Sequence, residues 1–246
     1  MAYYDYFKQF RQMSPEELRR KAEASMENAR AKGRSYEPVI LQGRPRQICK
    51  TWWGDAWCRN LERYADFASR IDRGKRYVRS GAVVDLKIHG GDIKAKVQGS
   101  RRTPYNVEIK VDPLPEKRSR EIEEKSLGKI KDLAALAGGE FPEELEELFC
   151  SRDGLFPTPD EIHFSCSCPD WAYMCKHVTA VMYGIGVRLD ENPFYFFPMR
   201  GLDVDRLIDK AIENRLDSML SHADVKSPRI MQGADLLEIF GVEQGG

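Results

Sequence analysis

The stretch of sequence that decides the fold is Cys166-Ser-Cys168-Pro-Asp-Trp-Ala-Tyr-Met-Cys175-Lys-His177. It places three thiols and one imidazole close together in a chain of 246 residues that has 6 cysteines and 4 histidines. Four ligands of these types form the Cys₃His set that closes tetrahedral structural zinc sites. We therefore expect Cys166, Cys168, Cys175 and His177 to bind a structural Zn²⁺ and to leave no open position for a substrate.

The spacing of these ligands predicts the local structure. Residues i and i+2 of an extended segment point to the same side, so a short strand at Ile162-His163-Phe164 would direct Cys166 and Cys168 toward one point. After the loop, apolar residues recur at helical spacing as an amphipathic stripe. Cys175 should then lie in the turn before a helix, with His177 in its first turn. His163 is an alternative fourth ligand.

A structural alternative is that these residues are unrelated buried cysteines, or a disulfide and a spare thiol. The chain begins Met1-Ala-Tyr-Tyr-Asp and shows neither the basic region nor the apolar region of a signal peptide. We therefore expect a cytoplasmic protein, and the reducing cytoplasm disfavours disulfides. No apolar run approaches the length of a membrane span, so no membrane partner is expected.

Outside the cysteine-rich stretch, the sequence predicts an α+β fold. A small antiparallel β meander covered by helices is expected, together with a zinc-stapled module of short strands followed by a helix, and C-terminal helices. Residues 75–111 mostly alternate between apolar and polar types and contain the hairpin signal Gly90-Gly91. A capped helix should begin at Ser14-Pro15-Glu16-Glu17, end near Gly33 and form a peripheral arm.

A second helix is expected from Thr51 to Ser69, with Trp53, Trp57, Leu61 and Tyr64 along one stripe. This stripe favours core packing over a base-stacking platform, because large aromatic side chains mostly bury themselves. Further helices are expected at 119–137, 142–149, 203–220 and 234–240. The chain is accordingly divided into an N-terminal helical arm (1–38), a basic α+β domain (39–115), an acidic helical connector (116–158), the zinc module (159–202) and C-terminal helices (203–246).

The net charge is zero, but positive and negative charges are unevenly distributed along the chain. Residues 1–110 carry an excess of 11 positive charges, and residues 111–246 an equal negative excess. Such a division suggests that one surface meets a polyanion, although the halves could also neutralise each other across an internal interface. The predicted nucleic-acid-binding residues are Arg73, Lys75, Arg76, Arg79, Lys94, Lys96, Arg101 and Arg102. Loops that carry Arg73–Arg79 and Arg101–Arg102 would flank the strand face of Lys94 and Lys96.

The Cys-x-Cys and Cys-x-His spacing resembles that of the SWIM zinc finger. Other stretches resemble motifs of a bacterial family of SWIM-containing proteins, and these are Thr51–Tyr64, Arg73–Gly81, Val97–Ser100, Gly154–Pro157, Cys166–Gly186 and Phe194–Gly201. The resemblance covers roughly residues 38–210. It implies DNA or protein binding and gene proximity to a Swi2/Snf2-type ATPase, but it implies no established reaction.

The sequence shows no Gly-rich phosphate loop, nucleophile elbow or His-Glu-x-x-His pair. We therefore expect a protein that is not an enzyme and has no small-molecule substrate. The leading hypothesis is an accessory protein that binds nucleic acid, DNA most of all, without sequence specificity. The alternative is an adaptor subunit of a Swi2/Snf2-type ATPase complex that does not itself bind DNA.

Overall fold

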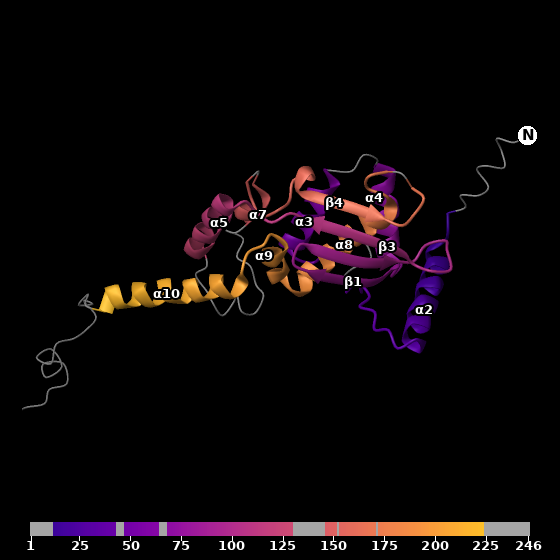
Figure 1. Cartoon of the computed structure of the whole chain (residues 1–246), viewed down its shortest axis with the longest axis horizontal. Helices are drawn as coiled ribbons and strands as arrows, with labels where there is room; N and C mark the ends of the chain where they lie inside the picture. Colours follow the sequence, from indigo (N-terminus) through magenta and orange to yellow (C-terminus); the bar gives the residue numbers. More distant parts are fainter. Residues whose placement is uncertain are drawn as a thin grey trace, which may run out of the picture.

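A four-stranded antiparallel sheet with the order β1-β2-β3-β4 lies at the centre of the fold (Figure 1). The computed structural model of the chain describes residues 12–42, 47–63, 68–129, 146–151, 153–170 and 172–223. The strands are β1 (Val83–His89), β2 (Asp92–Val97), β3 (Tyr105–Val111) and β4 (Ile162–Cys166). The α-helices are α2 (Pro15–Ala31), α3 (Trp52–Glu62), α4 (Ala68–Arg79), α5 (Glu116–Lys129), α7 (Glu146–Cys150), α8 (Lys176–Glu191), α9 (Phe196–Met199) and α10 (Val204–Ala223). Short 3₁₀ turns span Pro159–Glu161 and Pro193–Tyr195. The predicted α+β class is confirmed.

The sheet follows the predicted meander and then gains a strand from far along the chain. Gly90, whose φ is 57°, makes the tight turn between β1 and β2. Ile93, Ala95 and Val97 of β2 are buried, whereas Lys94 is exposed, as the alternation predicted. The predicted short strand before the cysteines is β4, which pairs antiparallel with β3. Residues of the predicted basic domain and zinc module therefore share one sheet, and the five-segment division stays a prediction.

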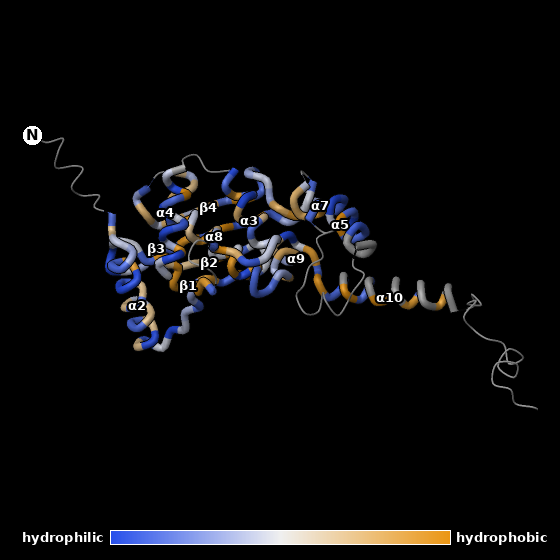
Figure 2. Tube along the Cα trace, turned by 180° about the vertical axis from the view of Figure 1, so that it is seen from behind, coloured by the Kyte–Doolittle hydropathy of each residue, from blue (hydrophilic) through white to orange (hydrophobic). Residues whose placement is uncertain are grey.

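Helix α8 is the element around which the fold packs. It contacts all four strands, and α3 and α4 pack against it. Its residues from His177 to Val187 are all buried. The predicted amphipathic stripe is therefore only part of a helix that is covered on every side. Figure 2 shows the hydrophobic residues gathered around α8, β1 and β2.

The tryptophan stripe anchors α3 on α8. Trp53 donates a hydrogen bond from Nε1 to the Leu189 carbonyl at 2.9 Å, and Trp57 donates one to the Met182 carbonyl at 3.0 Å. Both indoles are buried. The prediction of core packing is confirmed, and the base-stacking alternative for these two rings is not supported.

The structure corrects the helix predicted from Thr51 to Ser69. Helix α3 ends at Glu62, and a separate helix, α4, runs from Ala68 to Arg79. The stretch Arg73–Arg79 was predicted as a loop but is therefore helical. Gly74 lets α4 approach α8 closely, because a Cβ at this position would lie 2.4 Å from Thr179 Cγ2.

Helix α2 forms with the capping box that the sequence predicted, since Ser14 and Glu17 exchange both backbone-to-side-chain hydrogen bonds. It is less peripheral than predicted, because Leu18, Ala22 and Ala29 are buried and the helix contacts β1 and α4. The helix predicted at 203–220 is α10, and the Asp203 carboxylate caps it by accepting the Asp205 N–H. The helix predicted at 234–240, and the parts of the helices predicted at 119–137 and 142–149 that fall within residues 130–145, lie outside the described residues. Among the described helices, none combines the length and apolar character needed to cross a bilayer.

Candidate metal centre

Four side chains converge at the end of the sheet where β4 finishes. Cys166 is the last residue of β4, Cys168 follows in the loop, Cys175 caps α8 and His177 lies in the first turn of α8. Their candidate ligand atoms all lie within 4.8 Å of one another. The predicted cluster is therefore formed, and it could hold a metal ion.

Local contacts explain why the loop returns to this point. Beyond Cys166, Ser167 stays beside β3 because its N–H donates to the Asn106 carbonyl and its Oγ accepts from the Asn106 N–H. Asp170 accepts from the Ala172 N–H and pairs with Arg70 of α4. The Tyr173 hydroxyl donates to the Ile162 carbonyl at 2.7 Å and closes the loop over β4.

The distances fit a small tetrahedral ion. Nδ1 of His177 lies 3.9 Å from Sγ of Cys166 and 4.0 Å from Sγ of Cys175. Zinc bonds of about 2.3 Å to sulfur and about 2.0 Å to nitrogen separate such atoms by about 3.5 Å in a tetrahedron. A small inward movement of the side chains would complete the site. Three thiolates and one imidazole are ligands for a soft or borderline metal rather than for Mg²⁺ or Ca²⁺.

The electrostatics of the cluster favour the ligand form of two of its members, His177 and Cys168. Burial lowers the pKa of His177, which keeps its imidazole neutral and able to coordinate. Hydrogen bonds from Cys166 and Cys175 lower the pKa of Cys168, whereas the pKa of Cys166 is raised, chiefly by its contact with Cys168. One thiolate is thus favoured over three, and a divalent cation would neutralise the charge that forms when all three thiols ionise.

His163 is not a member of this cluster. Its Nε2 lies 3.0 Å from Oδ2 of Asp112, and its side chain is half exposed. It lies near the start of β4, three residues from Cys166 along an extended strand. The alternative in which His163 supplies the fourth ligand is therefore wrong.

The predicted basic residues fall into two groups. Lys94 and Lys96 lie on the open face of the sheet, where Lys94 is opposite Glu108, and Lys96 donates to Asn106 at 2.9 Å. The others lie on α4 and in the loop of residues 98–104 between β2 and β3. Helix α4 packs on α8, which contacts the strands, so the structure does not gather the predicted residues on one face.

Several members of the second group are held by other residues. Lys75 forms an ion pair with Glu62 at 2.7 Å, and Arg76 donates to Gln12 at 2.8 Å. Arg101 lies over the ring of Tyr105 at 5.0 Å, and Arg73 and Arg102 are exposed. Nucleic-acid binding by these residues stays a prediction.

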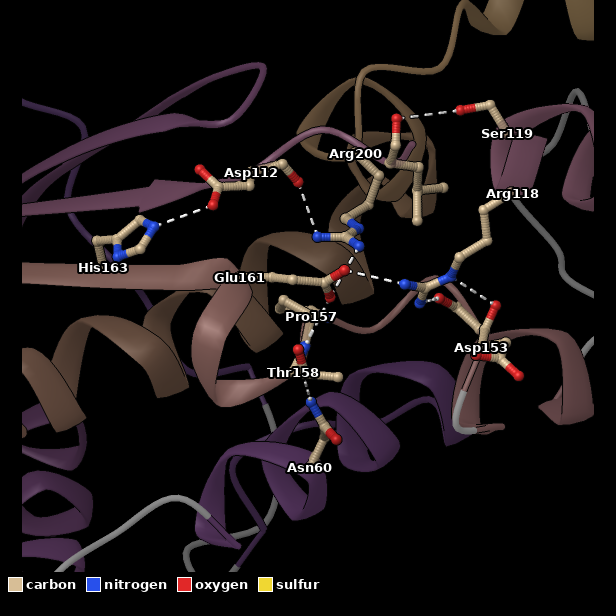
Figure 3. A network of polar contacts seen from close by, with 12 residues as sticks. Asn60, Asp112, Arg118, Ser119, Asp153, Pro157, Thr158, Glu161, His163 and Arg200 are labelled. Carbon is tan, nitrogen blue, oxygen red and sulfur yellow. Dashed lines mark hydrogen bonds and ion pairs between the residues drawn. The ribbon is translucent and has the colours of Figure 1, made fainter. Parts of the chain in front are cut away.

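A second polar centre, which the sequence analysis missed, lies at the opposite end of β4 (Figure 3). Glu161 pairs with Arg118 at 2.9 Å and with Arg200 at 3.0 Å, and it accepts the Thr158 N–H at 2.9 Å. Arg200 is buried and also donates to the Asp112 carbonyl at 2.7 Å. The only local signal was Glu161 three residues after Thr158, because the two arginines are distant in sequence.

Burial alone would raise the pKa of Glu161, but the Thr158 N–H and the guanidinium groups of Arg200 and Arg118 hold it below its usual value. Burial lowers the pKa of Arg200, and Glu161 opposes this effect. The centre is therefore a charged cross-link between the start of β4, α5 and the segment after α9.

Comparisons with known proteins give one informative similarity. The chain is 34% identical over 179 residues to "Uncharacterized protein Rv2102" of Mycobacterium tuberculosis, and the match covers 72% of this chain. The matched region spans 64% of the length of that relative, which is less than two thirds. No family model matches the chain, and no solved structure matches it.

Proposed function

We propose that this protein is a non-catalytic, zinc-binding accessory protein of the SWIM type that binds nucleic acid within a larger complex in the cytoplasm. The observation that carries the metal assignment is the convergence of Cys166, Cys168, Cys175 and His177. Zinc suits this set because it accepts three thiolates and one imidazole in a tetrahedron. With four protein ligands the ion has a structural role, and the metal supplies rigidity rather than a reactive water.

The nucleic-acid surface is proposed at the metal end of the sheet. Arg101 lies over Tyr105, and Tyr105 stacks on His177, so the basic loop is tied directly to the metal ligand. Arg73 and Arg76 lie on α4 beside Tyr77, whose ring also contacts His177. A metal-rigidified support for cationic side chains would position phosphate contacts without reading bases.

The open face of the sheet suits phosphates less well. Its four lysines on β1–β3 (Lys87, Lys94, Lys96 and Lys110) alternate with the carboxylates of Asp85, Asp92 and Glu108. Such mixed charge attracts a polyanion weakly, since neighbouring carboxylates oppose each contact. The two groups of basic residues therefore provide matched variants for a test.

The test is a titration of a random-sequence DNA duplex at several salt concentrations. If wild type neutralises about five phosphates, log K should fall with log salt with a slope of about −4 to −5. Arg101→Glu with Arg102→Glu should weaken binding and make the slope less steep by about 2. The matched variant Lys94→Glu with Lys96→Glu should have the smaller effect. Unchanged binding by the Arg101 and Arg102 variant would contradict this surface.

The second candidate function is an adaptor subunit of a Swi2/Snf2-type ATPase complex. The observation that favours it is a row of exposed apolar side chains at four-residue spacing on α10, namely Ile212, Leu216 and Leu220. The aromatic residues that follow α8 offer less support for an adaptor, because Phe196 and Phe197 are buried in the core. Purification from the native host after nuclease treatment separates the two functions, because only an adaptor would retain the ATPase.

A further inference from the structure

The imidazole of His177 is held in an unusual way for a metal ligand. Its Nδ1 faces the thiols, so Nε2 lies on the other side of the ring. Metal-binding histidines generally donate this second N–H to a carboxylate or a carbonyl, and that bond fixes the orientation of the ring. Here Nε2 is buried, and no hydrogen-bond partner for it is found among the described residues. Other contacts must therefore orient the ring.

Two aromatic rings enclose the imidazole. Tyr105, the first residue of β3, stacks on it with a centroid distance of 4.4 Å and an interplanar angle of 28°. Tyr77 of α4 approaches it edge-on, with a centroid distance of 5.4 Å and an angle of 71°. Both tyrosines are themselves buried. Rotation of the imidazole about its Cβ–Cγ bond would therefore have to displace one of them.

Gly99 brings the backbone against the same ring. A Cβ at this position would lie 3.1 Å from Nε2 of His177 and 2.6 Å from Cε2 of Tyr105. Cβ atoms are essentially never found that close to a ring carbon, so any side chain here would have to move Tyr105, the imidazole or both. Glycine is required at this position for space rather than for a positive φ.

Gln98 fixes the loop that carries Gly99. It is fully buried, and its Nε2 donates to the carbonyls of Gly99 at 3.0 Å and Arg101 at 2.7 Å. Its Oε1 accepts from the Ser25 hydroxyl of α2 at 2.5 Å. Its own N–H donates to the Ala82 carbonyl at 2.7 Å. The backbone beside the imidazole is thus held from the residue before β1, from α2 and from within the loop.

We propose that Gly99 and Tyr105 are positioning residues of the metal site. They hold the His177 ring with Nδ1 toward the thiolates and take the place of the usual hydrogen bond to the second nitrogen. This inference rests on the proposed metal binding. It gives a physical role to the stretch Val97-Gln98-Gly99-Ser100, which contains no metal ligand.

The test compares four variants of the full-length, zinc-loaded chain. Gly99→Ala and Tyr105→Ala should each lower zinc affinity about 10- to 100-fold in competition with a chromophoric chelator. Tyr105→Phe keeps the stacked ring and should behave as wild type. Gly74→Ala is the matched control, because its Cβ would strain the contact with Thr179 without touching the imidazole.

Cobalt substitution separates positioning from general destabilisation. At saturating Co²⁺, the visible absorption bands report the geometry of the ligands, which a remote loss of stability does not change. The bands should shift in Gly99→Ala and Tyr105→Ala and stay unchanged in Gly74→Ala and Tyr105→Phe. Wild-type bands in both test variants, with zinc affinities equal to that of Gly74→Ala, would overturn the inference. If Gly99→Ala does not fold, the two Tyr105 variants still decide. A wild-type chain that binds no metal would instead defeat the proposed function.

Discussion

At the end of the sheet where β4 finishes, Cys166, Cys168, Cys175 and His177 meet at one point. At the end where β4 begins, Glu161 joins Arg118 and Arg200 through ion pairs. Both centres link β4 to helices that follow or precede it in the chain. The first could hold an ion from solution, whereas the second consists of side chains alone. The stability of the two ends should therefore respond to different conditions.

The difference between the two ends of the sheet is also relevant to function. The metal end carries the exposed residues Arg73 and Arg102 beside buried tyrosines, whereas the ion-pair end is built around one carboxylate and two guanidinium groups. Helix α8 runs from the metal centre into the core and contacts every strand. Loss of the metal should therefore disturb both ends, whereas loss of the ion pairs should leave the metal centre in place. Three predictions examine this asymmetry.

The largest effect is expected from removal of a metal ligand. Zinc contributes about 10–16 kcal/mol of apparent binding energy to finger peptides, comparable with the stability of about 5–15 kcal/mol of a whole domain. Cys168→Ala or His177→Ala should therefore melt residues 160–190 and, through α8, loosen α3 and α4. Hydrogen–deuterium exchange measures this loss. Cys150→Ala, a half-buried thiol outside the cluster, is the control and should change little. Wild-type protection in both ligand variants would show that these residues bind no metal.

An intermediate effect is expected from Glu161→Ala. This change leaves the buried guanidinium of Arg200 without its carboxylate, and breaking a buried pair in this way costs about 3–5 kcal/mol. Denaturant unfolding of the zinc-loaded chain measures the change in the free energy of unfolding. Glu116→Ala is the control, because Glu116 pairs with Arg120 on the exposed face of α5 and such pairs contribute less than about 1 kcal/mol. The zinc content should be unchanged in both variants. Equal effects of the two substitutions on the free energy of unfolding would show that the centre at Glu161 does not stabilise the fold.

The smallest effect is expected in the dependence of stability on pH. Its direction follows from the lowered pKa of Glu161. Its folded pKa lies below the usual value of 4.5, so the unfolded chain takes up the proton first as the pH falls. The ionised carboxylate therefore stabilises the fold fully above about pH 5, and this contribution disappears as the pH falls through the folded pKa. The difference in unfolding free energy between wild type and Glu161→Gln should shrink below about pH 4.5. Because both proteins keep the thiols, acid effects on the metal centre cancel. A difference that grows on acidification would contradict the assignment.

The sequence was most informative where function depends on residues close together in the chain. The spacing of Cys166, Cys168, Cys175 and His177 predicted their convergence, and Gly90-Gly91 predicted the hairpin. Helix α4 was not predicted, because Gly74 and the abundant arginines resemble a loop, and its approach to Thr179 cannot be read from one segment.

The features that the sequence did not predict depend on contacts between residues that are distant in the chain. Arg200 and Glu161, or Gly99 and His177, meet only after the sheet has formed, and no local periodicity links them. Lys94 and Lys96 lie apart from the basic residues of α4 for the same reason. Helix α8 packs against both α4 and the strands, and it comes from a distant part of the chain. Sequence alone therefore predicted that the three cysteines and His177 lie together, but not which residues support them.

Metal binding by the Cys/His cluster can be measured by metal analysis of the full-length protein, purified without added metal and without chelator. We expect about one zinc ion per chain, with the thiols of Cys166, Cys168 and Cys175 protected from a thiol reagent until a chelator is added. A folded protein without a stoichiometric metal, in which these three thiols react as readily as Cys150, would contradict it.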